Sequence, residues 1–122
     1  FGLPMFEAAR EGLPIVAVGW SGQLDFLHHD GKDYFHSVEY ALSPVQENAR
    51  WKNVIEADSM WAYCSPSSYR EKLRDALEGN REDAEALQKI ILEKFSDEKL
   101  YELFVNSIIE NEVVVLDDEI IL

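Results

Sequence analysis

Cysteine and positive charge are both scarce in this chain of 122 residues, and long hydrophobic runs are absent. Cys64 is the one cysteine, which excludes an internal disulfide and a cysteine-based zinc cluster and favours a reducing, cytoplasmic compartment. Lys and Arg number 11 against 24 Asp and Glu, and the net charge of -13 disfavours binding to nucleic acid. Because no apolar stretch approaches the roughly 20 residues of a bilayer-spanning helix, we expect no membrane span.

The hydrophobic content of 47% is enough to build the core of about one domain. The chain opens with Phe1 in place of Met and enters a motif at once, so we expect a piece of a longer protein. We assign residues 1–110 to a single domain fragment and residues 111–122 to a tail. The tail contains two β-prone patches split by an acidic triplet, and is read as a strand, a partner-binding segment or a frayed end.

Local signals predict alternating helices and strands in the first half. Pro4 suits a first helical turn and Gly12 a left-handed stop, which predicts a helix over residues 4–11. The β-branched run at 15–18 is typical of a strand covered on both faces in a parallel sheet. The following segments are expected to be a turn at 19–22, one or two helical turns at 23–27, a second turn at 28–31 and an extended segment at 34–42.

Helix signals dominate the second half. Residues 44–57 are ambiguous, with a helix start at Pro44 as one reading, and residues 60–63 are expected to form a short strand. Ser65 as N-cap and Pro66 after it predict a helix that ends at Gly79. Asn80 and Ser96 are expected to begin two further helices. The sequence therefore predicts an α/β fold, with a short parallel sheet flanked by helices.

The opening segment carries the most specific motif. Phe1-Gly2-Leu3-Pro4-Met5-Phe6-Glu7-Ala8-Ala9, followed by Gly12 and Pro14-Ile15-Val16, resembles the signature of retaining glycosyltransferases of family 4, which have the GT-B fold. That signature contains two glutamates separated by seven residues. Glu7 matches the second, and the first would lie before residue 1. Weaker likenesses follow at Ser21-Gly22-Gln23-Leu24-Asp25, Met60-Trp61-Ala62-Tyr63, Ser65-Pro66-Ser67-Ser68 and Phe95-Ser96-Asp97-Glu98-Lys99.

The resemblance implies a Rossmann-like partial domain, the C-terminal half of a GT-B domain that binds a nucleotide sugar. The intact enzyme would transfer a hexosyl unit to an acceptor with retention, without a metal or other cofactor, and would need an N-terminal domain that is missing here. By itself the fragment is expected to be inactive. The implied donor-binding residues are Gly2, Leu3, Pro4, Met5 and Glu7, with Ser21 and Gly22 as further candidates.

Elementary chemistry agrees with these roles. Gly2 lets the backbone approach a diphosphate, and the N–H groups around Leu3, Met5 and Phe6 are expected to point out of a helix N-terminus that favours an anion. By the resemblance, Glu7 accepts hydrogen bonds from the vicinal hydroxyls of a ribose. Asp25 is better explained as a helix-start residue.

Other candidates are interpreted as structural. His28, His29 and Asp30 are neighbours whose side chains diverge, so we predict no metal site there. Cys64 is expected to be a small core residue. The three tryptophans are expected to be packing anchors rather than sugar platforms: Trp20, Trp51 and Trp61.

Two alternative functions stay open. One is a non-catalytic interaction domain that keeps a glycosyltransferase-like fold, and the other is a different GT-B enzyme, such as a nucleotide-sugar epimerase or a phosphorylase. Product analysis separates these reactions from sugar transfer. An exposed sheet edge also leads us to expect self-association of the fragment into a homo-oligomer.

Overall fold

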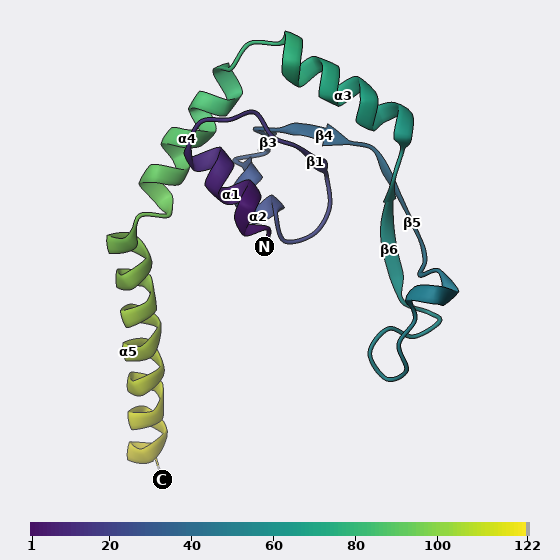
Figure 1. Ribbon diagram of the computed structural model, residues 1–122. Coiled ribbons are helices and arrows are strands. Elements are labelled where there is room, and N and C mark those ends of the chain that lie inside the picture. The colour runs from purple at the N-terminus through teal and green to yellow at the C-terminus, as the bar shows by residue number, and fades with distance from the viewer. Residues whose placement is uncertain (122) are drawn as a thin grey trace. The chain divides into compact units, whose positions relative to one another are not determined.

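The computed structural model describes the backbone of residues 1–121 and the side chains of residues 1–109. Residues 1–121 form five α-helices, one short 3-10 helix and six strands (Figure 1). The contacts divide the chain into two compact units, Phe1–Gln88 and Lys89–Leu122. Within residues 1–121, no helix combines the length and the apolar character needed to cross a bilayer.

The first unit is built around a parallel pair of strands. Strand β1 (Val16–Val18) pairs with β4 (His36–Val38) in parallel, and helix α3 (Pro66–Glu78) packs against both strands. The predicted short parallel sheet with a flanking helix is therefore confirmed. The expectation that residues 15–18 are covered on both faces is wrong for the strand itself: Val16–Val18 are half-buried. Among the described elements α3 is the main helix packed against β1, so the two faces of the strand are not both covered.

The core of this unit collects apolar side chains from helices, strands and loops. Phe26 and Leu27 are fully buried in the short helix α2 (Leu24–Leu27), which lies within the predicted helical segment 23–27. Phe26 contacts the rings of Phe1 and Phe6 at centroid distances of 5.0 and 5.3 Å. The other buried apolar residues of this unit are Ala9, Ile15, Val38, Val45, Ala84 and Leu87.

Helix α1 (Leu3–Arg10) confirms the helix predicted at 4–11 to within one residue. It stops at Gly12, which is buried and has a φ of +76°, the left-handed conformation expected there. The side-chain amide of Gln88, from helix α4 (Glu82–Lys94), donates a hydrogen bond of 3.0 Å to the carbonyl of Arg10. A Cβ placed on Gly12 would lie 3.0 Å from Gln88 Oε1, so the same side chain occupies the space beside the glycine.

Replacing Gly12 by alanine should therefore cost more stability than replacing Gly31, which also has a positive φ but has open space around it. For Gly31→Ala we expect a loss of about 1 kcal/mol from the left-handed backbone alone. Gly12→Ala should lose about 1 kcal/mol more, because Gln88 must give up its bond to Arg10. Urea unfolding of the two variants measures the difference, and equal losses would show that the Gln88 contact contributes nothing.

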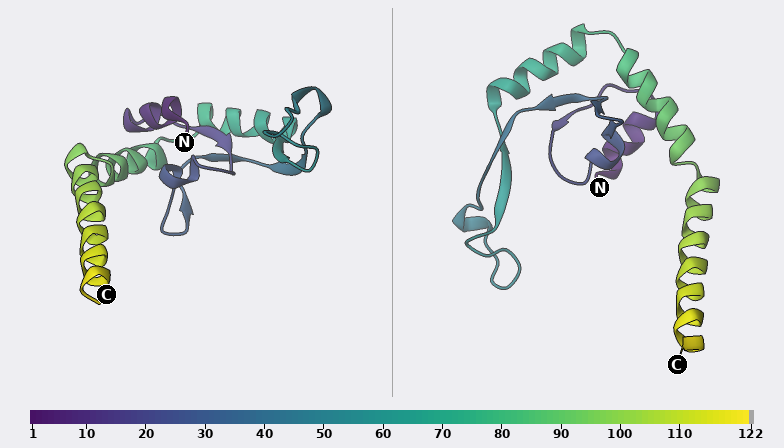
Figure 2. Two further views of the ribbon diagram at one scale, coloured as in Figure 1. Left: turned by 90° about the horizontal axis from the view of Figure 1, so that it is seen from below. Right: turned by 180° about the vertical axis from the view of Figure 1, so that it is seen from behind.

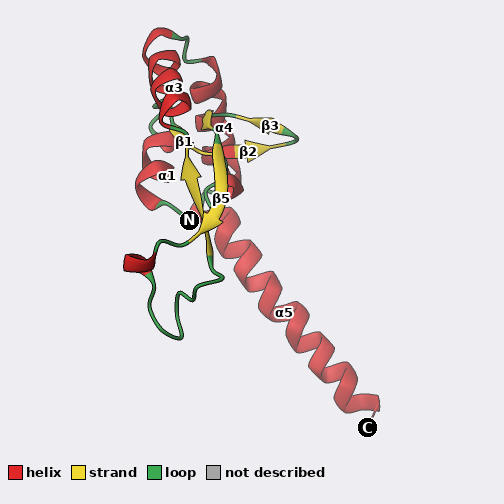
Figure 3. Cartoon of the chain, turned by 90° about the vertical axis from the view of Figure 1, so that its right-hand side faces the viewer, coloured by secondary structure: helices red, strands yellow, loops and turns green. Residues whose placement is uncertain are grey.

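The segment from residue 28 to residue 42 differs from the expectation. His28–His29 form strand β2, which pairs antiparallel with β3 (Lys32–Asp33), and the predicted turn at 28–31 shrinks to Asp30 and Gly31 (Figure 3). Both turn residues have positive φ, as a tight two-residue hairpin requires. The extended segment at 34–42 is present as two strands, β4 and β5 (Tyr40–Pro44), interrupted at Glu39.

Strand β5 pairs antiparallel with β6 (Met60–Cys64), and the two run side by side in the view from behind in Figure 2. The register places Tyr40 opposite Cys64 and Pro44 opposite Met60. The strand predicted at 60–63 is confirmed. A helix start at Pro44 is wrong, since Pro44 ends β5 and only the 3-10 turn η1 (Glu47–Ala49) follows.

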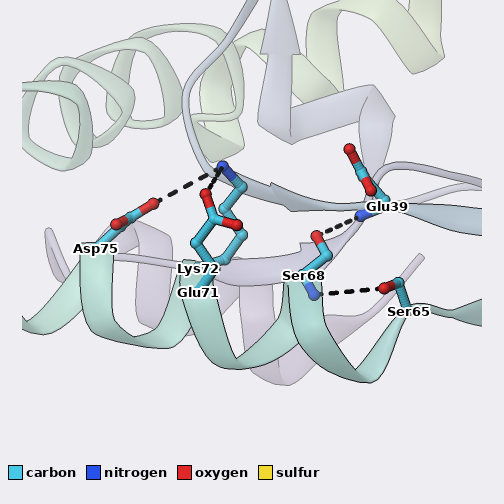
Figure 4. A network of polar contacts seen from close by, with 6 residues as sticks. All are labelled: Glu39, Ser65, Ser68, Glu71, Lys72 and Asp75. Atoms are coloured by element: carbon cyan, nitrogen blue, oxygen red, sulfur yellow. Dashed lines mark hydrogen bonds and ion pairs between the residues drawn. The ribbon is translucent and has the colours of Figure 1, made fainter.

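The predicted start of α3 is confirmed in detail (Figure 4). Ser65 Oγ accepts a hydrogen bond from the Ser68 backbone N–H, and Pro66 occupies the first helical turn. Ser68 is itself buried, and its Oγ accepts a bond of 3.0 Å from the Glu39 N–H. The Glu39 carbonyl also accepts a bond from the Ser65 N–H. The start of α3 thus binds both backbone groups of Glu39, the residue that directly follows β4.

Ser68→Ala should lower the free energy of unfolding by about 1–3 kcal/mol, since it leaves the Glu39 N–H without its acceptor. Ser67→Ala is the matched control: Ser67 is the preceding residue and is exposed, and we expect its loss to stay within about 0.5 kcal/mol. Chemical denaturation of both variants tests this. Similar losses of stability in the two variants would mean that a general weakening of the helix start, and not the lost bond to Glu39, causes the effect.

The two remaining helix starts are also confirmed. Asn80 Oδ1 accepts a bond of 3.1 Å from the Glu82 N–H at the start of α4, and Ser96 Oγ accepts one of 3.4 Å from the Lys99 N–H at the start of α5 (Asp97–Ile121). Helix α5 continues through residues 111–121, so the strand considered for the tail is wrong over those residues. Leu122 lies outside the described residues.

Candidate functional site

The N-terminus of α1 has no side-chain cap. Gly2 caps the helix in the left-handed conformation, with φ 85° and ψ 58°, and no side chain satisfies the first turn. The N–H groups of Leu3 and Met5 belong to the first turn and have no partner within the helix, whereas Pro4 has no N–H. The expectation for Phe6 is wrong, because its N–H donates to the Gly2 carbonyl at 3.1 Å in the first hydrogen bond of the helix. No acidic residue lies in this turn to neutralise the dipole.

Gly2 is favoured there by its backbone conformation, because its positive φ disfavours any side chain. A Cβ would also lie 2.7 Å from Met5 Cε, but this atom is the end of a flexible side chain that can rotate away. The backbone path at the motif therefore depends on glycine.

The turn after β1 is the second part of the site. The Trp20 N–H donates to the Val18 carbonyl at 2.8 Å, and the side chain of Gln23 donates to the same oxygen at 3.0 Å. Ser21 has a φ of 78°, which makes this a tight and specific turn. Gln23 was not among the predicted site residues, and its role in holding the turn is visible only from its contact with Val18.

The structure brings these two segments together. A Cβ on Gly22 would lie 3.5 Å from the Phe1 nitrogen, and one on Gly2 would lie 4.0 Å from Gln23 Cβ. The motif at residues 1–7 and the turn at 21–22 thus adjoin at the carboxyl end of β1. This is the edge at which parallel α/β sheets commonly bind ligands.

Exposure divides the predicted residues into two groups. Leu3, Pro4, Glu7 and Ser21 are exposed, whereas Gly2, Met5 and Gly22 are half-buried. The Glu7 carboxylate lies on α1 one turn beyond Leu3 and is accessible to a ligand. The arrangement offers amide donors for an anion and a carboxylate for hydroxyl groups on one short helix.

Asp25 lies in the first turn of α2, where its backbone N–H donates to the Gly22 carbonyl at 3.2 Å. It is exposed. Its interpretation as a helix-start residue is confirmed.

The two neighbouring histidines point to different partners. His28 Nδ1 lies 2.6 Å from Asp33 Oδ1 across the β2–β3 hairpin, and both side chains are exposed. His29 is buried, and its Nε2 lies 2.9 Å from the Phe26 carbonyl oxygen. Within the part of the chain whose side chains are described, no three His, Cys, Asp or Glu side chains gather in a way that suits a metal ion.

The expectations for cysteine and tryptophan are wrong. Cys64 is exposed rather than a core residue. None of the three tryptophans is buried: Trp20 is 36% exposed, Trp61 38% and Trp51 67%. The reason is tertiary, since Trp61 and Cys64 lie on β6, whose one neighbouring strand in the described chain is β5, and no further layer covers it.

A cavity of about 460 Å³ lies elsewhere, at the amino ends of β1 and β4. It is therefore not part of the predicted donor site, which adjoins the carboxyl end of β1. Its lining combines segments distant in sequence, which local patterns do not reveal: Pro14, Ile15, Tyr34, Phe35, His36, Asp75, Glu78, Gly79, Asn80, Asp83 and Ala84. Lys32 Nζ binds Asp83 Oδ1 at 2.7 Å, and this hydrogen bond raises the pKa of Lys32 above 10.5.

Comparison with known proteins finds no family model, no curated protein and no solved structure that matches this chain.

Proposed function

We propose that this chain forms part of the donor site of a retaining glycosyltransferase with a Rossmann-like GT-B domain. In the proposed reaction a sugar passes from a nucleotide-sugar donor to an acceptor, with retention at the anomeric carbon. Residues 1–110 would contribute the nucleotide and diphosphate subsites, together with an N-terminal domain on the same parent chain. The support is the motif at residues 1–9 and the placement of that motif in the structure.

The observation that carries the proposal is the meeting of α1's N-terminus with the turn at Ser21 and Gly22. Residues 21 positions apart in sequence adjoin at the carboxyl end of a parallel strand, where an anionic ligand would lie close to the first-turn amides of α1. A site of this kind needs no basic side chain, because the amides and the helix dipole supply the positive potential. It is therefore compatible with a net charge of -13.

In this proposal each predicted residue has a distinct role. Gly2 keeps the backbone close to the diphosphate, and the N–H groups of Leu3 and Met5 donate to its oxygens. Pro4 fixes the first turn of α1 without adding an N–H. Glu7 accepts the two ribose hydroxyls, and the Ser21-Gly22 turn borders the diphosphate on the other side.

Calorimetric titration of the parent chain, extended upstream to include the N-terminal domain, with a panel of nucleoside diphosphate sugars tests the proposal. We expect one donor to bind with a dissociation constant in the micromolar range, that is, about -8 kcal/mol at 1 µM. The corresponding nucleoside, without phosphate, should bind far more weakly, because the amide donors then have no anion. Absence of binding by every donor would contradict the donor-site proposal.

One observation favours a second candidate, a non-catalytic interaction domain. Large apolar side chains on the β5–β6 hairpin are exposed, including Trp61 and Tyr63, and such surfaces commonly mark contacts with other proteins. In that case Glu7 would have no ligand, and no nucleotide sugar would bind.

A further inference from the structure

The β5–β6 hairpin with its connecting loop, residues 40–64, is here called the hairpin arm. Its two strands pack mainly against each other. Apolar side chains are exposed on both of its faces: Tyr40, Leu42 and Met60 on one, and Trp61 and Tyr63 on the other. An isolated two-stranded hairpin is marginal in water, so a surface of this kind is normally covered.

The backbone of the arm has one complete open edge. The Val45 N–H donates to the Ser59 carbonyl, and the Ser65 N–H to the Glu39 carbonyl. Each of these two hydrogen bonds joins residues that lie directly opposite each other on the two strands. Because hydrogen-bonded and non-hydrogen-bonded pairs alternate along antiparallel strands, the two bonds determine which of the pairs between them are hydrogen-bonded. On β6 the N–H and C=O groups of Met60, Ala62 and Cys64 consequently point away from β5.

The outer edge of β5 is less suited to pairing. Its outward residues are Tyr40, Leu42 and Pro44, and proline has no N–H to donate. A proline is a common device against edge-to-edge pairing. The β6 edge carries no such block, and β6 has β5 as its one partner among the strands that the structure describes.

Charge does not oppose the approach of a second copy to the arm. The chain as a whole carries a net charge of -13, so two copies repel each other over most of their surface. The arm contains only Glu47, Glu56 and Asp58 against Arg50 and Lys52, a net charge of -1. Repulsion between two arms is thus small, and salt screens the remaining charge at distances beyond about 8 Å.

We propose that two copies of this chain associate through the β6 edges of their hairpin arms. Antiparallel pairing about a twofold axis at Ala62 places Ala62 opposite its own copy and Met60 opposite Cys64 of the other copy. Because all three residues point their N–H and C=O groups outward, each pair exchanges two bonds and the contact contains about six hydrogen bonds. A continuous four-stranded sheet results, with Leu42 and Met60 of both copies on one face.

Sedimentation of the full 122-residue chain tests the association. At about 100 µM we expect the wild type to have close to twice the monomer mass of 14.0 kDa. Ala62→Asp places two carboxylates face to face on the axis, and we expect it to weaken dimerisation at least tenfold. Ala57→Asp adds the same charge in the exposed loop of the arm, away from the strand edge, and should leave the dimer largely intact.

Cross-linking tests the register independently of the folding of the charged variant. In a Cys64→Ser background, Ala62→Cys brings two thiols together on Cα atoms about 5.5 Å apart, within the range of a disulfide. We expect rapid covalent dimers upon oxidation for Ala62→Cys, and few for Ala57→Cys in the same background. A wild type that stays monomeric, or a dimer that neither Ala62→Asp disrupts nor Ala62→Cys cross-links, would overturn the proposal.

Discussion

Replacing Glu7 by alanine is expected to weaken the binding of a nucleoside diphosphate sugar by about 100-fold. In the proposed site the carboxylate accepts two hydrogen bonds from adjacent ribose hydroxyls, and hydrogen bonds to a charged group contribute about 1.5–3 kcal/mol each. Because 1.4 kcal/mol corresponds to a factor of ten, the loss of two bonds at the lower end of this range, about 3 kcal/mol, gives a change of this size. Calorimetric titration of the wild type and of Glu7→Ala with the same donor measures it directly.

Glu11→Ala is the matched control for this prediction. Glu11 is also an exposed glutamate of the same helix region, at the C-terminal end of α1 and away from Gly2. Both substitutions remove one negative charge from an acidic chain, which by itself slightly favours an anionic donor. Glu11→Ala should therefore bind as well as the wild type or marginally better. Unchanged affinity in Glu7→Ala would refute the ribose role of Glu7 while leaving the diphosphate site to be judged by the wild-type titration.

Replacing Leu27 by alanine is expected to have the second large effect, a loss of about 2–5 kcal/mol in the free energy of unfolding. Leu27 is 0% exposed beside Phe26 on α2, so truncation removes buried apolar contact and leaves a cavity. Domains of this size are stable by about 5–15 kcal/mol in total, so we expect the variant to lose a large part of that margin. Since α2 follows the Ser21-Gly22 turn directly, donor affinity should fall together with stability.

Leu77→Ala isolates the contribution of burial to this loss. Leu77 is the same residue type in the same compact unit, but it lies on α3 with 85% of its surface exposed. We expect the free energy of unfolding of Leu77→Ala to differ from that of the wild type by less than about 0.5 kcal/mol. Urea unfolding followed by tryptophan fluorescence reports on this unit alone, because Trp20, Trp51 and Trp61 all belong to it. Similar unfolding midpoints for the two variants would mean that α2 is not part of a stabilising core.

Local chemistry predicted the helix boundaries well. Ser65, Asn80 and Ser96 each accept a backbone N–H at a helix start, as their residue types indicate. Gly12 has the positive φ expected at a helix stop. These features depend on contacts within a few residues, and for that reason a sequence pattern is enough to locate them.

The errors concern residues whose surroundings come from distant parts of the chain. The run at 34–42 divides at Glu39, because α3 supplies Ser65 and Ser68 to bind that residue's backbone. Tail residues 111–121 continue α5, although their β-branched side chains favour strands. The intrinsic preference of a residue type for helix or strand is a weak signal, and the surrounding structure readily overrides it.

The candidate site shows the same division. The motif at residues 1–9 could be identified in the sequence, and its helix start follows from Gly2 and Pro4. That Gly22 lies against Phe1 could not be inferred from spacing, because it depends on how β1 and α1 pack.

By itself the sequence determined the α/β class, the helix starts and the motif at Glu7, all of which rest on residue type and short-range hydrogen bonding. Only the tertiary structure decided that Trp61 and Cys64 are exposed on a hairpin arm, and that the cavity of about 460 Å³ and the Ser21-Gly22 turn lie at opposite ends of the parallel strands. Burial is a property of the layers that cover a residue. A strand whose face no helix or second sheet covers exposes side chains that the same sequence would bury in a layered fold.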